Sequence, residues 1–345
     1  MANCGCGVQS TYPEGMARSH LTLAALATSA VPGLDVVRTA SFGTGTHNDF
    51  DAALLTDREG RHWIIRLPRN ERAAEEQAAD LVALRALSAG VRTRLPFAVS
   101  TFAGETRVKG TRVMVYQFVY GSKTRLANLD FDHAASVGRA IAAIHSLPTS
   151  FVADAGLPVL TAIEALRSCT SIIDRAAATG LVPGALLSRW EKATEETSLW
   201  QFQPTVINGS LTAESFLNSD GAVTGVLGWQ ELKVGDPAQD LFWLLGSRGE
   251  QVSDNGFAAY GEVRGTGDRQ VRQRAMLYAE LEIAKWLLHG TDSRSTEIVD
   301  DAVEMLHRLL DNVQSNSANP IGPQTLPTMA VDEVEEMLAR SERTV

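Results

Sequence analysis

Apolar and polar residues alternate along much of the first third of the chain and then change to helical spacing. Alternation with a period of two indicates half-buried strands, whereas apolar residues three and four positions apart indicate amphipathic helices. The first part is predicted to hold helices at 19–30 and Glu71–Ala89, and strands from Val36 and at Ala52–Thr56, His62–Leu67, Leu95–Val99 and Thr111–Tyr120. We therefore expect a small sheet accompanied by two helices.

The remainder of the chain is predicted to be mainly helical. The spacing indicates helices at Phe131–His145, 161–179, 184–197, Leu241–Leu245, 268–290 and 296–314, with a glycine-rich loop up to about residue 267. Two short β-rich runs interrupt them, and Asn218-Ser219-Asp220-Gly221 joins these runs. Asp-Gly favours the positive φ angles of a tight turn, so a β-hairpin is predicted there. A proline-containing linker and a short amphipathic helix at 331–338 are expected at the end.

Composition narrows the class of protein. A chain of 345 residues is long enough for two lobes with cores of their own. A net charge of −10 argues against nucleic acid and against an anionic membrane as partners, and it is compatible with a cationic small molecule. No apolar run approaches the roughly 18 residues of a membrane span. Three cysteines make no disulfide framework, which favours a reducing cytoplasm and hence a cytoplasmic protein.

One segment carries most of the candidate chemistry. It runs from Val206 to Leu217, continues through the hairpin to Trp229, and is followed by Gly235-Asp236-Pro237-Ala238-Gln239-Asp240. Its layout resembles the catalytic segment of the aminoglycoside and macrolide phosphotransferases, which are small-molecule kinases. That family has His-Gly-Asp, four residues, Asn or His, a hairpin, Asp-Trp, and then a Gly-Asp-Pro-Ala-x-Asp helix start.

The chemical positions of that pattern are changed in this chain. By the resemblance, Asn208 stands where the family has its His, and Ser210 stands where it has the catalytic Asp. Ser215 takes the place of the Asn or His, and Gly228 takes the place of the metal-binding Asp. Glu231, which follows the hairpin, is the candidate for a substitute metal ligand. In the family, the Gly-Asp-Pro-Ala-x-Asp segment is chiefly structural, because its carboxylates satisfy free N–H groups where a helix begins.

The first part of the chain holds the candidate nucleotide contacts. Gly43 and Gly45 lie in a turn between strands, where the lack of a Cβ lets backbone N–H groups approach phosphates. The strand Trp63-Ile64-Ile65-Arg66-Leu67-Pro68-Arg69 resembles the macrolide-kinase strand that carries the nucleotide-pairing cation. Arg66 is therefore the candidate partner of the α- and β-phosphates.

Two further features of a kinase can be assigned to this part. A kinase needs an acid on the following helix to hold the cation of the strand, and the spacing favours Asp80, with Glu76 as the alternative. The segment Val115–Gly121 has the apolar run and the glycine of the hinge that joins the two lobes.

The resemblance covers about residues 20–314. It implies an α+β, two-lobed protein-kinase-like fold, with a small N-terminal antiparallel-sheet lobe and a larger, mainly helical C-terminal lobe. The expected parts are a disordered extension at 1–18, a nucleotide-binding lobe at 19–121, a catalytic and substrate lobe at 122–314, and a linker with a short helix at 315–345. The implied cofactors are ATP or GTP and Mg²⁺, and the implied acceptor is a macrolide-like or other small molecule.

The changed positions alter the expected chemistry. A serine does not act as a general base at neutral pH, and that function is typically worth ~10²–10⁴ in rate. Mg²⁺ is usually held through carboxylates, which neither Ser215 nor Gly228 provides. The sequence therefore predicts a nucleotide-dependent small-molecule O-phosphotransferase whose activity is weak or lost. The alternatives are a pseudokinase that binds nucleotide or small molecule without transfer, and a scaffold that binds a partner through 331–345. The acceptor, the choice between ATP and GTP, and the oligomeric state stay open.

Overall fold

The computed structural model describes residues 19–43, 49–265, 267–315 and 321. The predictions for the extension at 1–18, for Gly45 and for a helix at 331–338 lie outside these residues. The chain divides into two compact units, and each is described by itself. The first unit comprises residues up to Lys123 together with Ser215–Glu231, so that the hairpin segment clusters with the N-terminal part.

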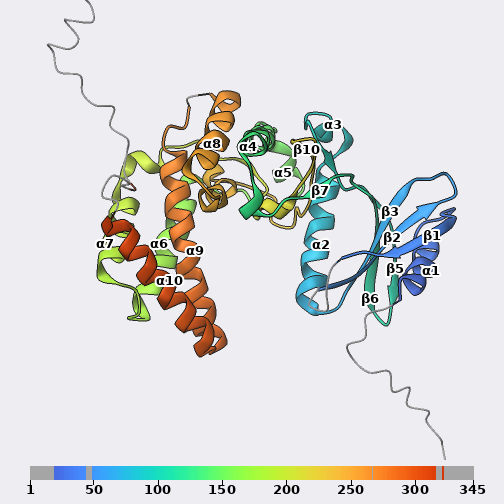
Figure 1. The fold of residues 1–345 in the computed structure, drawn as a ribbon, viewed down its shortest axis with the longest axis horizontal. Coiled ribbons are helices and arrows are strands. Elements are labelled where there is room, and N and C mark those ends of the chain that lie inside the picture. The colour runs from blue at the N-terminus through green and yellow to red at the C-terminus, as the bar shows by residue number, and fades with distance from the viewer. Residues whose placement is uncertain (1–18, 44–48, 266, 316–320, 322–345) are drawn as a thin grey trace, which may run out of the picture. The chain divides into compact units, whose positions relative to one another are not determined.

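The first unit contains a five-stranded antiparallel sheet in the order β1-β2-β3-β6-β5. Its strands are β1 (Val36–Ser41), β2 (Phe50–Asp57), β3 (His62–Pro68), β5 (Phe102–Val108) and β6 (Thr111–Gln117). Helix α1 (His20–Ala30) packs on one face over a core that includes Leu55, Ile65 and Val115 (Figure 1). Strand alternation places Arg66, Met114 and Tyr116 on the opposite face.

Helix α2 (Glu71–Ala86) follows β3 directly. It begins at Asn70, whose side chain accepts a hydrogen bond from the Ala73 N–H and so satisfies one of the free donors of the first turn. A short helix, α3 (Ala89–Arg92), continues the chain toward strand β4 (Ala98–Val99).

The second sheet of this unit contains the predicted hairpin. Strands β9 (Phe216–Ser219) and β10 (Ala222–Val226) pair antiparallel, and the sheet has the order β4-β10-β9-β7, with β7 at Ser122–Lys123. The two turn residues, Asp220 and Gly221, have φ angles of 53° and 76°. Both values are those of a type I′ turn, and the hairpin prediction is confirmed.

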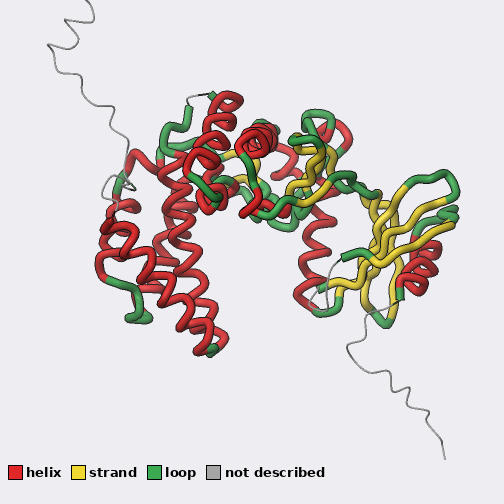
Figure 2. Tube along the Cα trace, viewed as in Figure 1, coloured by secondary structure: helices red, strands yellow, loops and turns green. Residues whose placement is uncertain are grey.

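The second unit is mainly helical, as the red segments of Figure 2 show. Its α-helices are α4 (Phe131–His145), α5 (Ser150–Asp154), α6 (Ala162–Ala178), α7 (Gly184–Glu195), α8 (Glu250–Arg264), α9 (Val271–Ser293) and α10 (Thr296–Ser315). Helix α4 packs against α8, and α9 packs against α6 and α10. A short two-stranded ladder pairs β8 (Thr205–Ile207) with β11 (Lys233–Gly235). The arrangement is the α+β one predicted from the sequence.

Three details of the prediction were wrong. Strand β5 was not predicted, because none of its residues is buried and its alternation is weak. Helix α8 lies where a glycine-rich loop was expected, and its Gly256 is buried against α4, where a Cβ on Gly138 would come within 2.1 Å of the Gly256 carbonyl oxygen. The close approach of the two helices explains both glycines. The segment expected as a helix at Leu241–Leu245 forms a 3₁₀ helix at Phe242–Gly246.

Candidate catalytic and nucleotide-binding residues

The turn Asn208-Gly209-Ser210 follows β8 directly in the second unit. The Asp240 carboxylate accepts hydrogen bonds from the N–H groups of Asn208 and Gly209, each with a nitrogen-to-oxygen distance of 2.7 Å. Gly209 has a φ of 85°, which a residue with a side chain rarely adopts. Both Asn208 and Asp240 are fully buried. Asp240 therefore fixes the backbone of this turn from inside the unit.

Asp240 is itself held by two side chains from distant helices. Its Oδ2 lies 3.1 Å from Nε2 of His145, the last residue of α4, and the His145 Nδ1 lies 2.9 Å from the Tyr260 hydroxyl of α8. All three residues are buried. Tyr260 was not found from the sequence, because its helix was predicted as a loop.

Ser210 stands where the resemblance puts the catalytic carboxylate. Its hydroxyl donates to Oδ1 of Asn208 at 3.2 Å, and its backbone N–H donates to the same oxygen at 3.2 Å. The side chain is partly exposed. A hydroxyl in this place can donate or accept a hydrogen bond, but it offers no negative charge and takes up no proton at neutral pH.

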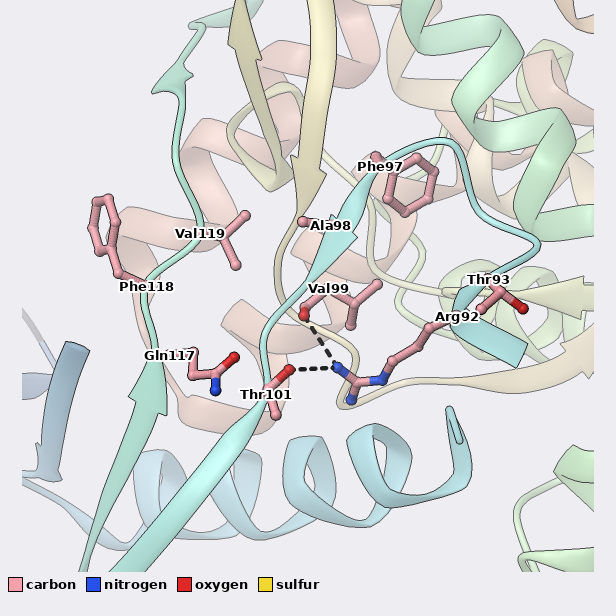
Figure 3. A pocket seen from close by; sticks show the side chains of 9 residues that line it. All are labelled: Arg92, Thr93, Phe97, Ala98, Val99, Thr101, Gln117, Phe118 and Val119. Atoms are coloured by element: carbon pink, nitrogen blue, oxygen red, sulfur yellow. Dashed lines mark hydrogen bonds between the residues drawn. The ribbon is translucent and has the colours of Figure 1, made fainter. Parts of the chain in front are cut away.

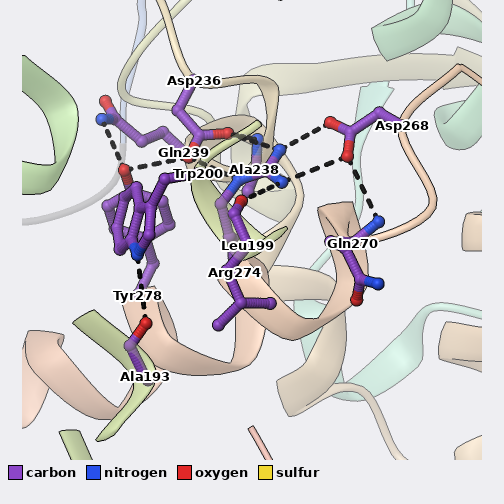
Figure 4. A network of polar contacts seen from close by, with 10 residues as sticks. All are labelled: Ala193, Leu199, Trp200, Asp236, Ala238, Gln239, Asp268, Gln270, Arg274 and Tyr278. Carbon is purple, nitrogen blue, oxygen red and sulfur yellow. Dashed lines mark hydrogen bonds and ion pairs between the residues drawn. The ribbon is translucent and has the colours of Figure 1, made fainter. Parts of the chain in front are cut away.

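Asp236 has a structural role that Figure 4 displays. Its carboxylate caps the 3₁₀ helix Pro237–Asp240 by accepting the Ala238 N–H at 2.9 Å, as the sequence predicted. The Arg274 guanidinium donates to both Asp236 oxygens, at 2.8 and 3.1 Å, and to Asp268. Burial alone would lower the pKa of Arg274, but the two carboxylates more than compensate and raise it. Neither Arg274 nor Asp268 was identified from the sequence.

In the first unit, Asp80 lies within electrostatic range of Arg66. Burial raises the pKa of Asp80 above its ordinary value, and the hydrogen bond from Trp229 and the charge of Arg66 lower it by less. The Asp80 Oδ1 accepts the backbone N–H of Trp229 at 2.8 Å. Glu76, the alternative acid, forms an ion pair with Arg72 at 2.5 Å on the exposed side of the same helix.

Arg66 has an aromatic neighbour that the sequence did not reveal. Its guanidinium carbon lies 3.9 Å from the centroid of the Phe50 ring. The ladder pairs Phe50 with Pro68 and Ala52 with Arg66, so Phe50 is a diagonal neighbour of Arg66 on the same face of the sheet. Phe50 lies two positions before Ala52, so a strand extended to Phe50 would have placed both residues on one face. This neighbour was missed because the strand was predicted to begin at Ala52.

The positions that the resemblance assigns to a metal carry few suitable donors. Ser215 offers a hydroxyl, and Gly228 has no side chain and a φ of 74°. The Glu231 side chain is exposed. Within the described residues, no three His, Cys, Asp or Glu side chains form a group that could hold a metal ion. Mg²⁺ takes hard oxygen ligands, usually carboxylates, so the residues at these positions do not fit it.

Gly43 is exposed and has a φ of 101°, and Gly45 lies outside the described residues. Phe42, directly before Gly43, makes an edge-on contact with Phe118 of the predicted hinge, with ring centroids 6.0 Å apart. The beginning of the glycine turn therefore contacts the hinge segment within the first unit.

A pocket of about 380 Å³ lies elsewhere in this unit, between residues 92–101 and 117–119 (Figure 3). Arg92 forms part of its wall and donates to the Val99 carbonyl at 3.1 Å and to the Thr101 hydroxyl at 3.0 Å. Gln117, Phe118 and Val119 of the predicted hinge line this pocket, whereas Gly43, Arg66 and Asp80 do not. Among the described residues, no helix is long and apolar enough to cross a membrane.

Solved structures show the same fold. The chain superposes on the apoenzyme of the macrolide 2′-phosphotransferase MphH from Brachybacterium faecium with a TM-score of 0.67, at 22% identity, covering 84% of this chain and 98% of that one. For the GDP complex of wild-type aminoglycoside 2′-phosphotransferase-IIIa, the TM-score is 0.67 at 19% identity, covering 86% and 99%. The chain therefore has the two-lobed, kinase-like fold of these structures.

Sequence comparison gives the family. The model of the phosphotransferase enzyme family matches residues 42–278, which is more than half of the chain. This protein belongs to the phosphotransferase enzyme family. An uncharacterised protein of Bacillus subtilis (strain 168), YcbJ, is 26% identical over 213 residues, a match that spans 57% of this chain and 66% of that relative, just under two thirds of its length.

Proposed function

We propose that this protein binds ATP or GTP together with a small molecule, and that its phosphoryl transfer from one to the other is weak or absent. The observation that carries the proposal is the turn at Ser210. Asp240 accepts the N–H groups of the two residues before Ser210, while the Ser210 side chain is a hydroxyl that donates to Asn208. An ordered turn with a hydroxyl at position 210, and no carboxylate there to orient or deprotonate an acceptor hydroxyl, supports binding with little or no transfer.

The nucleotide part of the proposal rests on the first unit and on the relatives. Arg66 provides a cation on β3, and its charge lowers the pKa of Asp80. Structures of similar fold are GDP and ADP complexes. Others are complexes with kanamycin, gentamicin and streptomycin, so macrolides and aminoglycosides are the first acceptors to test.

The test compares binding and transfer in the same full-length protein. Binding is measured as a thermal shift with ATP and with GTP, because a ligand at 100 times its dissociation constant adds ~2.7 kcal/mol to stability. Transfer is measured with γ-labelled nucleotide and a panel of macrolides and aminoglycosides. We expect binding, with turnover lower by a factor of at least ~10² than a variant with the carboxylates restored.

The restored variant combines Ser210→Asp with Gly228→Asp. The matched control combines Ser210→Asn with Gly228→Ala, which changes size and backbone strain without adding charge. Activity in the first variant and not in the second would show that the site lacks only the carboxylates. Measurable wild-type turnover that equals that of the restored variant would refute the proposal of weak transfer, and the absence of any nucleotide shift would refute nucleotide binding.

A further inference from the structure

The cation of the candidate phosphate site is fixed by an aromatic ring. Arg66 and Phe50 lie on the same face of the sheet, and the guanidinium carbon is 3.9 Å from the ring centroid. A planar guanidinium stacks on an aromatic face in a way that a lysine ammonium does not. Phe50 therefore restricts the orientation of the Arg66 side chain, and such stacking uses the face of the guanidinium rather than its N–H edge.

The acid of this site is already engaged by the protein backbone. Asp80 accepts the Trp229 N–H at 2.8 Å, and this hydrogen bond ties α2 to the residue directly after Gly228. Arg66 compensates part of the negative charge of Asp80. Asp80 thus holds the chain in place at the position where the family pattern has its metal-binding Asp.

The residues at the two positions that the family pattern assigns to metal ligands are poor ligands for a divalent cation. A serine hydroxyl at 215 is a weak neutral ligand, and position 228 has no side-chain donor. Mg²⁺ gives up its water ligands reluctantly and is normally held by one or two carboxylates together with substrate phosphates. In this unit the fixed positive charge beside the candidate phosphate site comes from an arginine.

We infer that this site takes the polyphosphate of a nucleotide as a metal-free anion, with Arg66 as its cation and Phe50 as the residue that positions Arg66. The inference rests on the proposed nucleotide binding and extends it to the charge state of the ligand. A metal-free nucleotide carries more negative charge than its Mg²⁺ complex, so it interacts more strongly with a fixed guanidinium.

The experiment is a calorimetric titration of ATP and of GTP into the full-length protein, in excess EDTA and in excess Mg²⁺. We expect the dissociation constant in EDTA to be equal to or lower than that in Mg²⁺. Tightening by Mg²⁺ of more than about tenfold would overturn the inference while leaving nucleotide binding intact. If the Glu231→Ala variant lost that tightening, Glu231 would be identified as a metal ligand, and the inference of metal-free binding would be wrong. No binding under either condition would overturn both this inference and the proposed function.

Variants separate the positioning role of Phe50 from a merely structural one. Phe50→Leu is expected to weaken ATP binding in EDTA about three- to tenfold, and Phe50→Tyr, which keeps the ring, by no more than about twofold. In an Arg66→Met background, Phe50→Leu is expected to cause no further loss of affinity. An equal loss in both backgrounds would show that Phe50 acts through the fold and not through Arg66.

Metal dependence can also be added to the site. Ser215→Asn combined with Gly228→Asp is expected to make Mg²⁺ tighten nucleotide binding. A Cβ added at Gly228, which is exposed, would make an ordinary contact with the Gln230 Oε1 at 3.4 Å, and Asp tolerates positive φ better than most residues. The matched control, Ser215→Asn with Gly228→Ala, also places a side chain at this positive-φ position but adds no carboxylate, and it is expected to stay metal-independent. Metal-dependent binding in that control would overturn the inference.

Discussion

Replacing Arg274 by methionine is expected to be among the most destabilising single changes in the second unit. Arg274 is fully buried, and its guanidinium donates to both oxygens of Asp236, to Asp268 and to the Leu199 carbonyl at 2.9 Å (Figure 4). The guanidinium carbon of Arg274 also lies 4.1 Å from the centroid of the Phe202 ring. Methionine fills much of the same volume but leaves the buried Asp236 carboxylate without a countercharge.

The size of the effect follows from these contacts. Breaking a buried ion pair by removing one partner typically costs about 3–5 kcal/mol, because the other charge stays buried and uncompensated. Asp236 keeps the Ala238 N–H and the Tyr278 hydroxyl, at 2.9 and 3.2 Å, so we expect a loss near the lower end of that range. Since natural domains are stable by about 5–15 kcal/mol, this loss would lower the melting temperature by on the order of 10 °C.

Urea unfolding at pH 7 measures the loss, and a double-mutant cycle identifies its cause. Arg274→Met combined with Asp236→Asn removes both charges, so its cost should be lower than the sum of the two single changes by about 2 kcal/mol or more. Arg308→Met, on the exposed side of α10, serves as the control and should cost less than about 0.5 kcal/mol. A loss below about 1 kcal/mol for Arg274→Met, or additive costs in the cycle, would contradict the reasoning.

Three further predictions concern other parts of the molecule. Gly138→Ala should destabilise the protein by about 1–3 kcal/mol in urea unfolding because its Cβ would meet the Gly256 carbonyl at 2.1 Å, whereas Gly261→Ala in open space should stabilise it by about 0.5–1 kcal/mol. Asp240→Ala should cost about 3–5 kcal/mol, measured in the same way, because it leaves two backbone N–H groups and a histidine without their buried acceptor. Burial raises the pKa of Asp80 in the folded state above its ordinary value of 3.8, so the folded state holds the proton more tightly. The stability due to this proton is present at low pH and is lost as pH rises through the folded pKa. Asp80→Asn should therefore have a higher free energy of unfolding than the wild type at pH 7. The difference should shrink in acid, where Asp80 of the wild type is protonated.

The parts of the fold that the sequence predicted well are those set by neighbouring residues. The β9–β10 hairpin follows from Asp220 and Gly221, and the buried positions of β3 alternate as expected for a half-buried strand. Strand β5 and helix α8 were missed for two different reasons. Strand β5 has no buried residue, and α8 contains Gly256, which lies against α4. Tertiary packing outweighed local propensity in α8.

In the candidate site, too, local sequence patterns predicted some features, whereas contacts between distant residues could not be predicted. Asp80 was selected by its spacing along one helix, and in the structure the charge of Arg66 lowers its pKa. The chain from Asp240 through His145 to Tyr260 joins residues 95 and 115 positions apart in sequence, and no local pattern could have indicated it. The same holds for the ion pair of Asp236 with Arg274, 38 positions apart.

The carboxylates that remain and those that are replaced differ in what their loss would cost the fold. Asp236 and Asp240 are fully buried and accept several hydrogen bonds each, so changing either would leave buried donors unsatisfied. Ser210 is partly exposed and Gly228 is exposed, so a carboxylate can be lost from either position without such a penalty. Buried acids at positions 236 and 240, together with uncharged residues at the exposed positions 210 and 228, are therefore the pattern that the proposed function, binding with weak or absent transfer, predicts.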